Sequence, residues 1–250
     1  MNGATALILF AVVVAIVWEG TTRFGLVNPR VLPPLTLVIA ELGDLLQQPS
    51  FQIDLRDTAV RVIVAFAVAA PLALSIGFLL GEKISLGRLL SPLLHFTLAV
   101  PQSIFLPIFI LVFGIGFVEK IVFGVTHAFF VIAINTVAAV RAVPRPYVTA
   151  ARSFGASPVR IYRSIYVPAM LPLIVTGLRL GLIFDILGIL LAEMYASQTG
   201  LGVRIFRWGQ NDDVVKLMAA VLLTSVLTIA VNECMRAWEA HAGRWQRTQE

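Results

Sequence analysis

Between Thr58 and Leu80 the sequence is TAVRVIVAFAVAAPLALSIGFLL, in which Arg61 is the one charged side chain. A helix needs about 20 mostly apolar residues to cross the ~30 Å of hydrocarbon in a bilayer, and this run is long enough. It is continuously apolar and lacks the alternation of a β-barrel strand. The segment is therefore predicted to be a membrane-spanning helix.

Similar runs recur along the whole chain. Of its 250 residues, 58% are hydrophobic and 13% are charged, whereas ordinary soluble domains have about 45–50% and about 25%. A soluble fold cannot bury this much apolar surface, but lipid can surround it. We therefore predict an all-α polytopic membrane protein, one domain over residues 1–250, with about six spans. They are Ala4–Trp18, Thr58–Leu80, Leu89–Phe113, Val118–Val140, Leu171–Leu191 and Val214–Met235.

The placement of basic residues predicts the orientation, because lysine and arginine collect in the cytoplasmic loops of membrane proteins. The loop between the fourth and fifth predicted spans, residues 141–170, holds five arginines and no acidic residue. We therefore place this loop and both termini in the cytoplasm. The net charge of +5 is then explained by membrane topology, and nucleic acid is not an expected partner.

The same loop has the signals of two short helices. Pro146 suits the first turn of a helix and Gly155 suits its C-terminal cap, so Tyr147–Phe154 is predicted to be helical. Ser157 and Pro158 suit the cap and first turn of a second helix. The loop is thus predicted to form a helix–turn–helix hairpin.

Two further features suggest how this hairpin is used. Ala150 and Ala151 give its first helix a small-residue face, and the arginines beside it can pair with acidic groups of a partner. Pro168 and Pro172 predict a bend into the fifth span. On composition alone, an equally good interpretation is that the arginines hold the loop inside and contact anionic headgroups.

The order of residues in this loop resembles a known signature. Thr149-Ala150-Ala151 is followed after three residues by Gly155, after nine more by Ile165, and then by one residue, Val167 and Pro168. It resembles the EAA signature of permease subunits in bacterial ATP-binding-cassette (ABC) importers, which is E-A-A, three residues, G, nine residues, I, one residue, L, P. This chain departs from it at Thr149, where Glu is usual, and at Val167, where Leu is usual.

The resemblance extends over most of the chain and is strongest to the nitrate/sulfonate/taurine branch. It is carried by Pro101, Pro107, Phe113–Gly116, Lys120-Ile121, Phe129-Phe130, Asn135-Thr136, Val140-Arg141, Thr176–Arg179, Ala192-Glu193, Ala196-Ser197 and Gly200–Gly202. It implies a type I importer permease fold in the bacterial inner membrane, a second permease copy, cytoplasmic ATPase subunits and a periplasmic solute-binding protein. It also implies that the first helix of the hairpin is the coupling helix. The residues carried over to ATPase coupling are Arg145, Thr149, Ala150, Ala151, Arg152, Gly155, Ile165 and Pro168.

Ionisable side chains within spans are costly, and they usually face the bundle interior or a water-filled path. Arg179 and Asp185 lie within the fifth predicted span and Glu193 lies near its outer end. Gln102, Ser103 and Asn135 are milder polar candidates for the translocation path. The alternative for all six is that they fix packing, through ion pairs or hydrogen bonds between helices or subunits.

No arrangement of side chains predicts an enzyme. The sequence has one cysteine, Cys234, and lacks the G-x-x-x-x-G-K-[ST] phosphate loop. No cofactor is therefore expected in this chain, and ATP and Mg²⁺ are expected on a separate subunit. The predicted function is a permease subunit that forms the path for a small solute, an anion such as nitrate, a sulfonate or taurine. The alternatives are importers of a vitamin precursor or aromatic acid, an ATPase-independent secondary transporter or channel, and a membrane-embedded enzyme.

Overall fold

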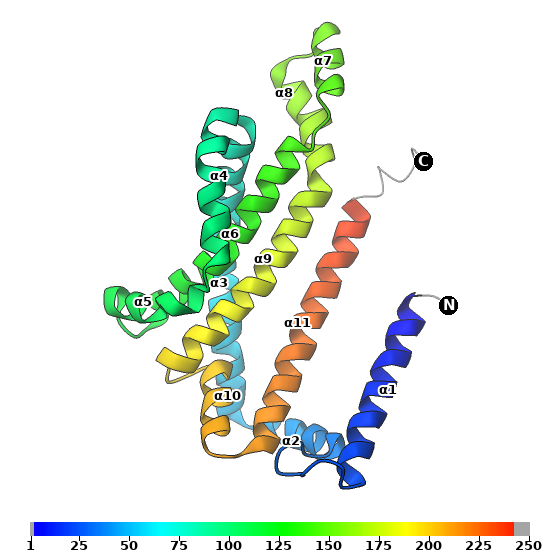
Figure 1. Cartoon of the computed structure of the whole chain (residues 1–250), viewed down its shortest axis with the longest axis vertical. Helices are drawn as coiled ribbons and strands as arrows, with labels where there is room; N and C mark the ends of the chain where they lie inside the picture. Colours follow the sequence, from blue (N-terminus) through cyan, green and yellow to red (C-terminus); the bar gives the residue numbers. More distant parts are fainter. Residues whose placement is uncertain (1–2, 243–250) are drawn as a thin grey trace. The chain divides into compact units, whose positions relative to one another are not determined.

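The computed structural model describes residues 3–242, which form helices and connecting turns without a strand (Figure 1). In chain order the helices are α1 Gly3–Arg23, α2 Leu35–Gln47, α3 Pro49–Glu82, α4 Ile84–Ala99, η1 Gln102–Phe105, α5 Leu106–Phe113, α6 Phe117–Arg141, α7 Arg145–Ser153, α8 Pro158–Ile161, η2 Tyr162–Tyr166, α9 Val167–Ala196, α10 Leu201–Gln210 and α11 Val214–Ala242.

The positions of the predicted spans agree with these helices. Within the described range, four helices are long and apolar enough to cross a membrane: α3, α6, the continuous helix Pro158–Ala196, and α11 up to Ala237. The first predicted span falls in α1, which is helical, and its crossing of the bilayer stays a prediction.

The third predicted span, Leu89–Phe113, is not straight. Ile84–Ala99 and Gln102–Phe113 pass the same test as a pair, but they meet at an angle of 85°. The break falls at Val100 and Pro101, both of which have extended backbone. Proline cannot donate the helical hydrogen bond and disfavours a helical residue before it, so Pro101 sets the place of the bend.

By their internal contacts, the residues group into two compact units. Unit 1 comprises the chain up to Thr58 together with Glu193–Leu227, and unit 2 comprises Ala59–Ala192 together with the residues from Thr228 onward. The expectation that residues 1–250 act as one membrane domain stays a prediction.

Unit 2 is built around α6, against which α3 packs through glycine. A Cβ atom on Gly77 would lie 2.6 Å from Thr136 Cβ and 2.7 Å from the Ala133 carbonyl oxygen. One turn on, a Cβ on Gly81 would lie 2.5 Å from Val140 Cβ. Gly77 and Gly81 form a Gly-x-x-x-Gly pair, which lets two membrane helices approach closely.

The contact of α6 with α9 also depends on glycine. A Cβ on Gly177 would lie 2.6 Å from Asn135 Cβ, and a Cβ on Gly181 would lie 2.3 Å from Ile132 Cγ1. Gly177 and Gly181 are again four residues apart. Since hydrocarbon gives helices no hydrophobic drive to associate, close van der Waals packing of this kind holds α3, α6 and α9 together.

In unit 1, polar contacts fix α2 against the end of α1. The Trp18 indole Nε1 donates to the Pro33 carbonyl at 2.9 Å. The Glu19 carboxylate accepts from the Thr36 backbone N–H at 3.1 Å and from its hydroxyl at 2.9 Å. Helix α2 begins directly after Pro34.

Candidate functional site

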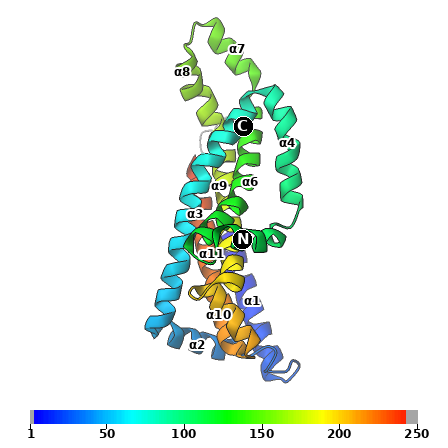
Figure 2. The same cartoon turned by 90° about the vertical axis from the view of Figure 1, so that its left-hand side faces the viewer.

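The predicted hairpin is present as α7 and α8, which project together beyond the ends of α6 and α9 within unit 2 (Figure 2). Helix α7 ends at Ser153, and Gly155 follows in the left-handed conformation with φ +72°. The Gly155 N–H donates to the Arg152 carbonyl at 2.9 Å and the Ala156 N–H donates to the Ala151 carbonyl at 3.0 Å. This is the Schellman arrangement, so the prediction that Gly155 caps the first helix is confirmed.

The second arm of the hairpin begins as predicted but continues differently. The Ser157 hydroxyl accepts from the Arg160 N–H at 3.4 Å, capping α8. The helix runs from Pro158 to Ala196 without ending at Pro168 or Pro172, and the predicted bend at these two prolines stays a prediction. The turn before Pro168 is the wider π-helical turn η2, which gives a proline ring room inside the helix.

The foot of the hairpin is held by a hydrophobic core of its own. Val148 of α7 and Ile161 of α8 are 8% and 5% exposed, and they belong to one cluster with Met170 of α9. Ala151 and Ile165 pack against the same cluster. Ala151 therefore faces inward, and of the two predicted alanines only Ala150 lies on the exposed side.

The tip of the hairpin exposes large apolar side chains that sequence patterns did not single out. Phe154 is 90% exposed and Val159 75%, while Tyr147, in the first turn of α7 near the foot, is 61% exposed. Thr149 is also exposed, and its hydroxyl donates to the Arg145 carbonyl at 3.1 Å within its own helix. We call Phe154 and Val159 the tip residues. An apolar surface of this kind outside a span is typical of a protein-binding site.

The milder polar candidates lie at two places in unit 2. Gln102 and Ser103 form the first turn of η1, at the bend between α4 and α5. The Gln102 side-chain oxygen is buried without a hydrogen-bond partner among the described residues. Asn135 lies in α6 opposite Gly177 and donates to the Val131 carbonyl at 2.8 Å. The structure does not bring these three residues together into one site.

Arg179 takes part in packing between two helices of unit 2. Its Nε lies 3.3 Å from Glu239 Oε2 of α11, and its Nη1 donates to Asn232 Oδ1 at 3.4 Å. This contact is the interhelical ion pair that the sequence left open as the alternative role of Arg179.

Asp185 is fully buried, and neither of its carboxylate oxygens has a hydrogen-bond partner among the described residues. It occupies space that Gly124 of α6 leaves free, since a Cβ there would lie 2.6 Å from Asp185 Oδ1. A buried carboxylate without a partner is costly, and in a span it usually marks function. Asp185 therefore stays a candidate path residue.

Glu193 belongs to a satisfied polar network in unit 1. It is fully buried, accepts from the Thr58 hydroxyl at 3.0 and 2.9 Å and accepts from the Gly202 N–H at 2.9 Å. Thr58 in turn accepts from the Leu201 N–H at 2.8 Å. These groups satisfy N–H groups at the start of α10, where negative charge is favoured by the helix dipole. Glu193 therefore has a structural role in holding this turn.

Asp54 completes this network from the first turns of α3. Its Oδ1 accepts from the Gly200 N–H at 2.7 Å, and its Oδ2 pairs with Arg204 Nε at 2.5 Å. Gly200 has φ +116°, and a Cβ there would lie 2.4 Å from the Glu193 carboxyl carbon. The turn between α9 and α10 thus requires glycine at this position.

A Thr58→Val substitution is expected to lower the midpoint of thermal unfolding, because it leaves the buried Glu193 carboxylate and the Leu201 N–H without their shared partner. The expected cost is about 1–3 kcal/mol. Circular dichroism of the detergent-purified protein measures it. Thr97→Val is the matched control, since the Thr97 hydroxyl bonds only to the Leu93 carbonyl of its own helix. An equal loss in both variants would contradict the role of the network.

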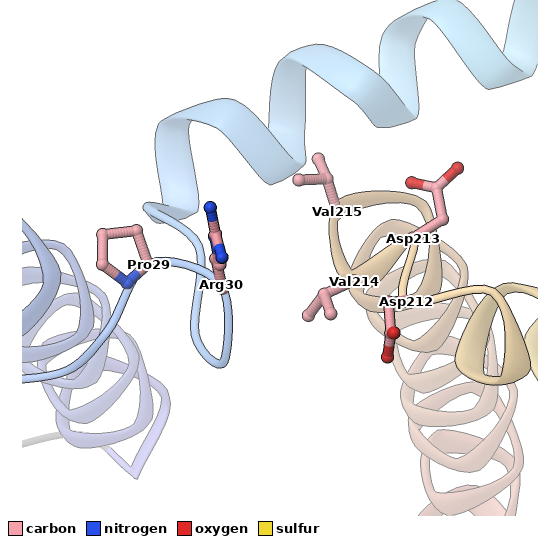
Figure 3. A pocket seen from close by; sticks show the side chains of 6 residues that line it. All are labelled: Pro29, Arg30, Asp212, Asp213, Val214 and Val215. Atoms are coloured by element: carbon pink, nitrogen blue, oxygen red, sulfur yellow. The ribbon is translucent and has the colours of Figure 1, made fainter.

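A pocket of about 600 Å³ lies elsewhere in unit 1, between Pro29–Arg30 and the start of α11 (Figure 3). Val214 and Val215 face Pro29 and Arg30 across it, and Asp212 and Asp213 complete the lining. None of the predicted path residues lines this pocket.

Comparison with known proteins identifies the class to which this fold and loop belong. Over residues 69–248 the chain matches the family described as "Binding-protein-dependent transport system inner membrane component". The chain therefore belongs to this family, and it is an ABC importer permease subunit with several membrane-spanning helices.

Its relatives are themselves permeases. The chain is 30% identical to the putative aliphatic sulfonates transport permease protein SsuC of Bacillus subtilis, covering 98% of this chain and 88% of SsuC. It is 26% identical to the taurine transport system permease protein TauC of Escherichia coli, over 92% and 85% of the two chains. It is 25% identical to the formylaminopyrimidine transport permease protein ThiX of Halalkalibacterium halodurans, over 96% of both.

A solved structure shows the same fold. A chain of the MetNI methionine ABC transporter in an inward-facing conformation superposes with a TM-score of 0.65 at 21% identity, covering 79% of this chain and all of that one. The predicted ABC importer permease fold is thus confirmed. The cytoplasmic position of the two termini stays a prediction.

Proposed function

We propose that this permease forms the path for a small anion across a bacterial inner membrane, driven by cytoplasmic ATPase subunits that dock on the α7–α8 hairpin. The observation that carries the proposal is the hairpin itself. Its foot is fixed by Val148 and Ile161, while its tip exposes Phe154. A rigid projection with an apolar end suits insertion into a groove of another protein.

The connections of the hairpin suit the transmission of movement. Helix α7 follows α6 after three residues, and α8 continues through η2 into α9. Because α6 and α9 pack closely at Gly177 and Gly181, a push on the hairpin moves them together. Closure of the ATPase can then tilt this helix pair and exchange outward-facing for inward-facing access.

The departure from the usual signature fits this docking mode. The Thr149 hydroxyl is engaged by the Arg145 carbonyl, and it carries no charge to offer a partner. Docking in this chain therefore depends on the tip residues and on the exposed Arg152. The interface is expected to be mainly apolar, with an arginine at its edge.

The proposed assembly has two copies of this permease, two ATPase subunits and a solute-binding protein in the periplasm. Membership of a binding-protein-dependent transport family supports the last of these. The solute class is proposed from the permeases for aliphatic sulfonates and taurine among the relatives. The formylaminopyrimidine permease supports the alternative, a vitamin precursor.

Transport by the reconstituted importer tests this proposal. Proteoliposomes that contain the permease and its ATPase, with the binding protein added outside, are expected to take up a radiolabelled aliphatic sulfonate or taurine only when ATP is inside. Formylaminopyrimidine is the competing solute. Uptake that needs no ATPase would contradict the proposal, and uptake of formylaminopyrimidine alone would overturn the solute class.

A further inference from the structure

A second pocket, of about 430 Å³, lies in unit 2 at the foot of the hairpin. Its lining residues come mainly from the α3–α4 turn and from the connection between α6 and α7. These two connections lie at the same end of unit 2 (Figure 2). Arginines from three elements contribute to it: Arg88 of α4, Arg141 at the end of α6 and Arg145 at the start of α7. We call this the arginine pocket.

The charges of the arginine pocket are not balanced within the described part of the chain. Glu82 is the one acidic side chain in its lining, and its carboxylate accepts from the Tyr162 hydroxyl. Arg141 donates to the Ser91 hydroxyl at 3.4 Å, and none of the three arginines forms an ion pair with an acid in residues 3–242. Three guanidinium groups around one cavity repel one another, so a bound anion would stabilise them.

The rest of the lining is apolar, and exposed apolar side chains follow along α4. Val143 and Tyr166 contribute to the wall of the pocket. Along α4, which also carries Arg88, Leu89 is 70% exposed, Leu93 59% and Phe96 70%. A molecule with an anionic head and an apolar tail can therefore place its head among the arginines and its tail along α4.

We propose that the arginine pocket binds a phosphate group, and that the headgroup of an anionic phospholipid is the source that the apolar surroundings favour. Guanidinium groups match phosphate by paired hydrogen bonds, and basic pockets at helix ends bind lipid headgroups. The bound phosphate would join α4 to the first turn of α7. The position of the hairpin would then depend on the lipid composition. Arg145, predicted from sequence to contact the ATPase, would serve this site instead.

Thermal unfolding of the full-length protein in nanodiscs tests the proposal. Replacing part of the phosphatidylcholine by phosphatidylglycerol is expected to raise the midpoint by at least about 3 °C. A second arm adds inorganic phosphate to phosphatidylcholine nanodiscs. A shift in that arm alone assigns the site to free phosphate, and a shift with phosphatidylglycerol assigns it to the lipid.

Variants separate the pocket from general charge effects. Arg88→Gln and Arg145→Gln are expected to abolish most of the shift, while Arg160→Gln, an exposed arginine of α8 outside the pocket, retains it. Unshifted midpoints in both arms would overturn the proposal, as would an equal loss in Arg160→Gln. If Arg88→Gln keeps the lipid shift but weakens ATPase binding, the pocket serves the ATPase and the proposal is wrong.

Discussion

A Gly155→Val substitution is expected to leave the protein folded in the membrane while reducing ATP-driven uptake about tenfold or more. Gly155 has φ +72°, and nothing lies within 4 Å of where its Cβ would be. The effect therefore arises from backbone conformation and not from a clash. A left-handed residue with a side chain costs about 1–2 kcal/mol. If the hairpin relieves this strain by adopting another conformation, the fraction of permease molecules whose hairpin can dock on the ATPase falls about tenfold.

The measurement compares uptake and ATPase activity in the same proteoliposomes. Gly155→Asn is the matched control, because asparagine tolerates the left-handed conformation and is expected to transport nearly as well as glycine. Normal uptake by a stably expressed Gly155→Val protein would refute the role of the cap. A Gly155→Asn protein as impaired as Gly155→Val would show that the position needs the absence of a side chain for another reason.

A Gly77→Ala substitution is expected to lower the stability of the protein by forcing α3 and α6 apart. The added methyl group would meet Thr136 Cβ at 2.6 Å and the Ala133 carbonyl oxygen at 2.7 Å. Neither atom can move by a change of rotamer, so α3 and α6 must separate. Overpacking of this kind costs about 1–3 kcal/mol, which is expected to show as a lower unfolding midpoint and a lower yield of folded protein.

Gly43→Ala is the control for this prediction. Gly43 is an exposed helical glycine of α2 with nothing within 4 Å of its Cβ position. Alanine there is expected to be neutral or stabilising by up to about 1 kcal/mol, because it favours the helix. A Gly77→Ala protein as stable as Gly43→Ala would contradict close packing of α3 on α6.

The sequence was sufficient for features set by local chemistry. Apolar runs gave the positions of the spans, and Gly155 and Ser157 gave the two caps of the hairpin, because each depends on a few neighbouring residues. The Gly-x-x-x-Gly spacing at Gly77–Gly81 and Gly177–Gly181 was not used as a signal, and spacing alone does not say which helix such a pair packs against.

Features that depend on tertiary packing were harder to predict from the sequence. Glu119 and Lys120 are buried in the first turn of α6 and pair at 3.1 Å, which the sequence pattern of the span Val118–Val140 does not show. Glu193 was a candidate for the path, but its partner Thr58 lies 135 residues away in the chain. The exposure of Phe154 depends on how the hairpin folds, and no periodicity marks it.

The central claim is that the tip of the α7–α8 hairpin contacts the ATPase, and site-directed crosslinking tests it most directly. Cys234, the one cysteine of the chain, is first replaced by serine. Phe154→Cys is then expected to crosslink to the ATPase subunit with a short bifunctional reagent, and its yield is expected to change with ATP. Gln47→Cys, exposed in α2, is expected to give no such product. A Phe154→Cys protein that fails to crosslink, or a Gln47→Cys protein that crosslinks equally well, would contradict the claim.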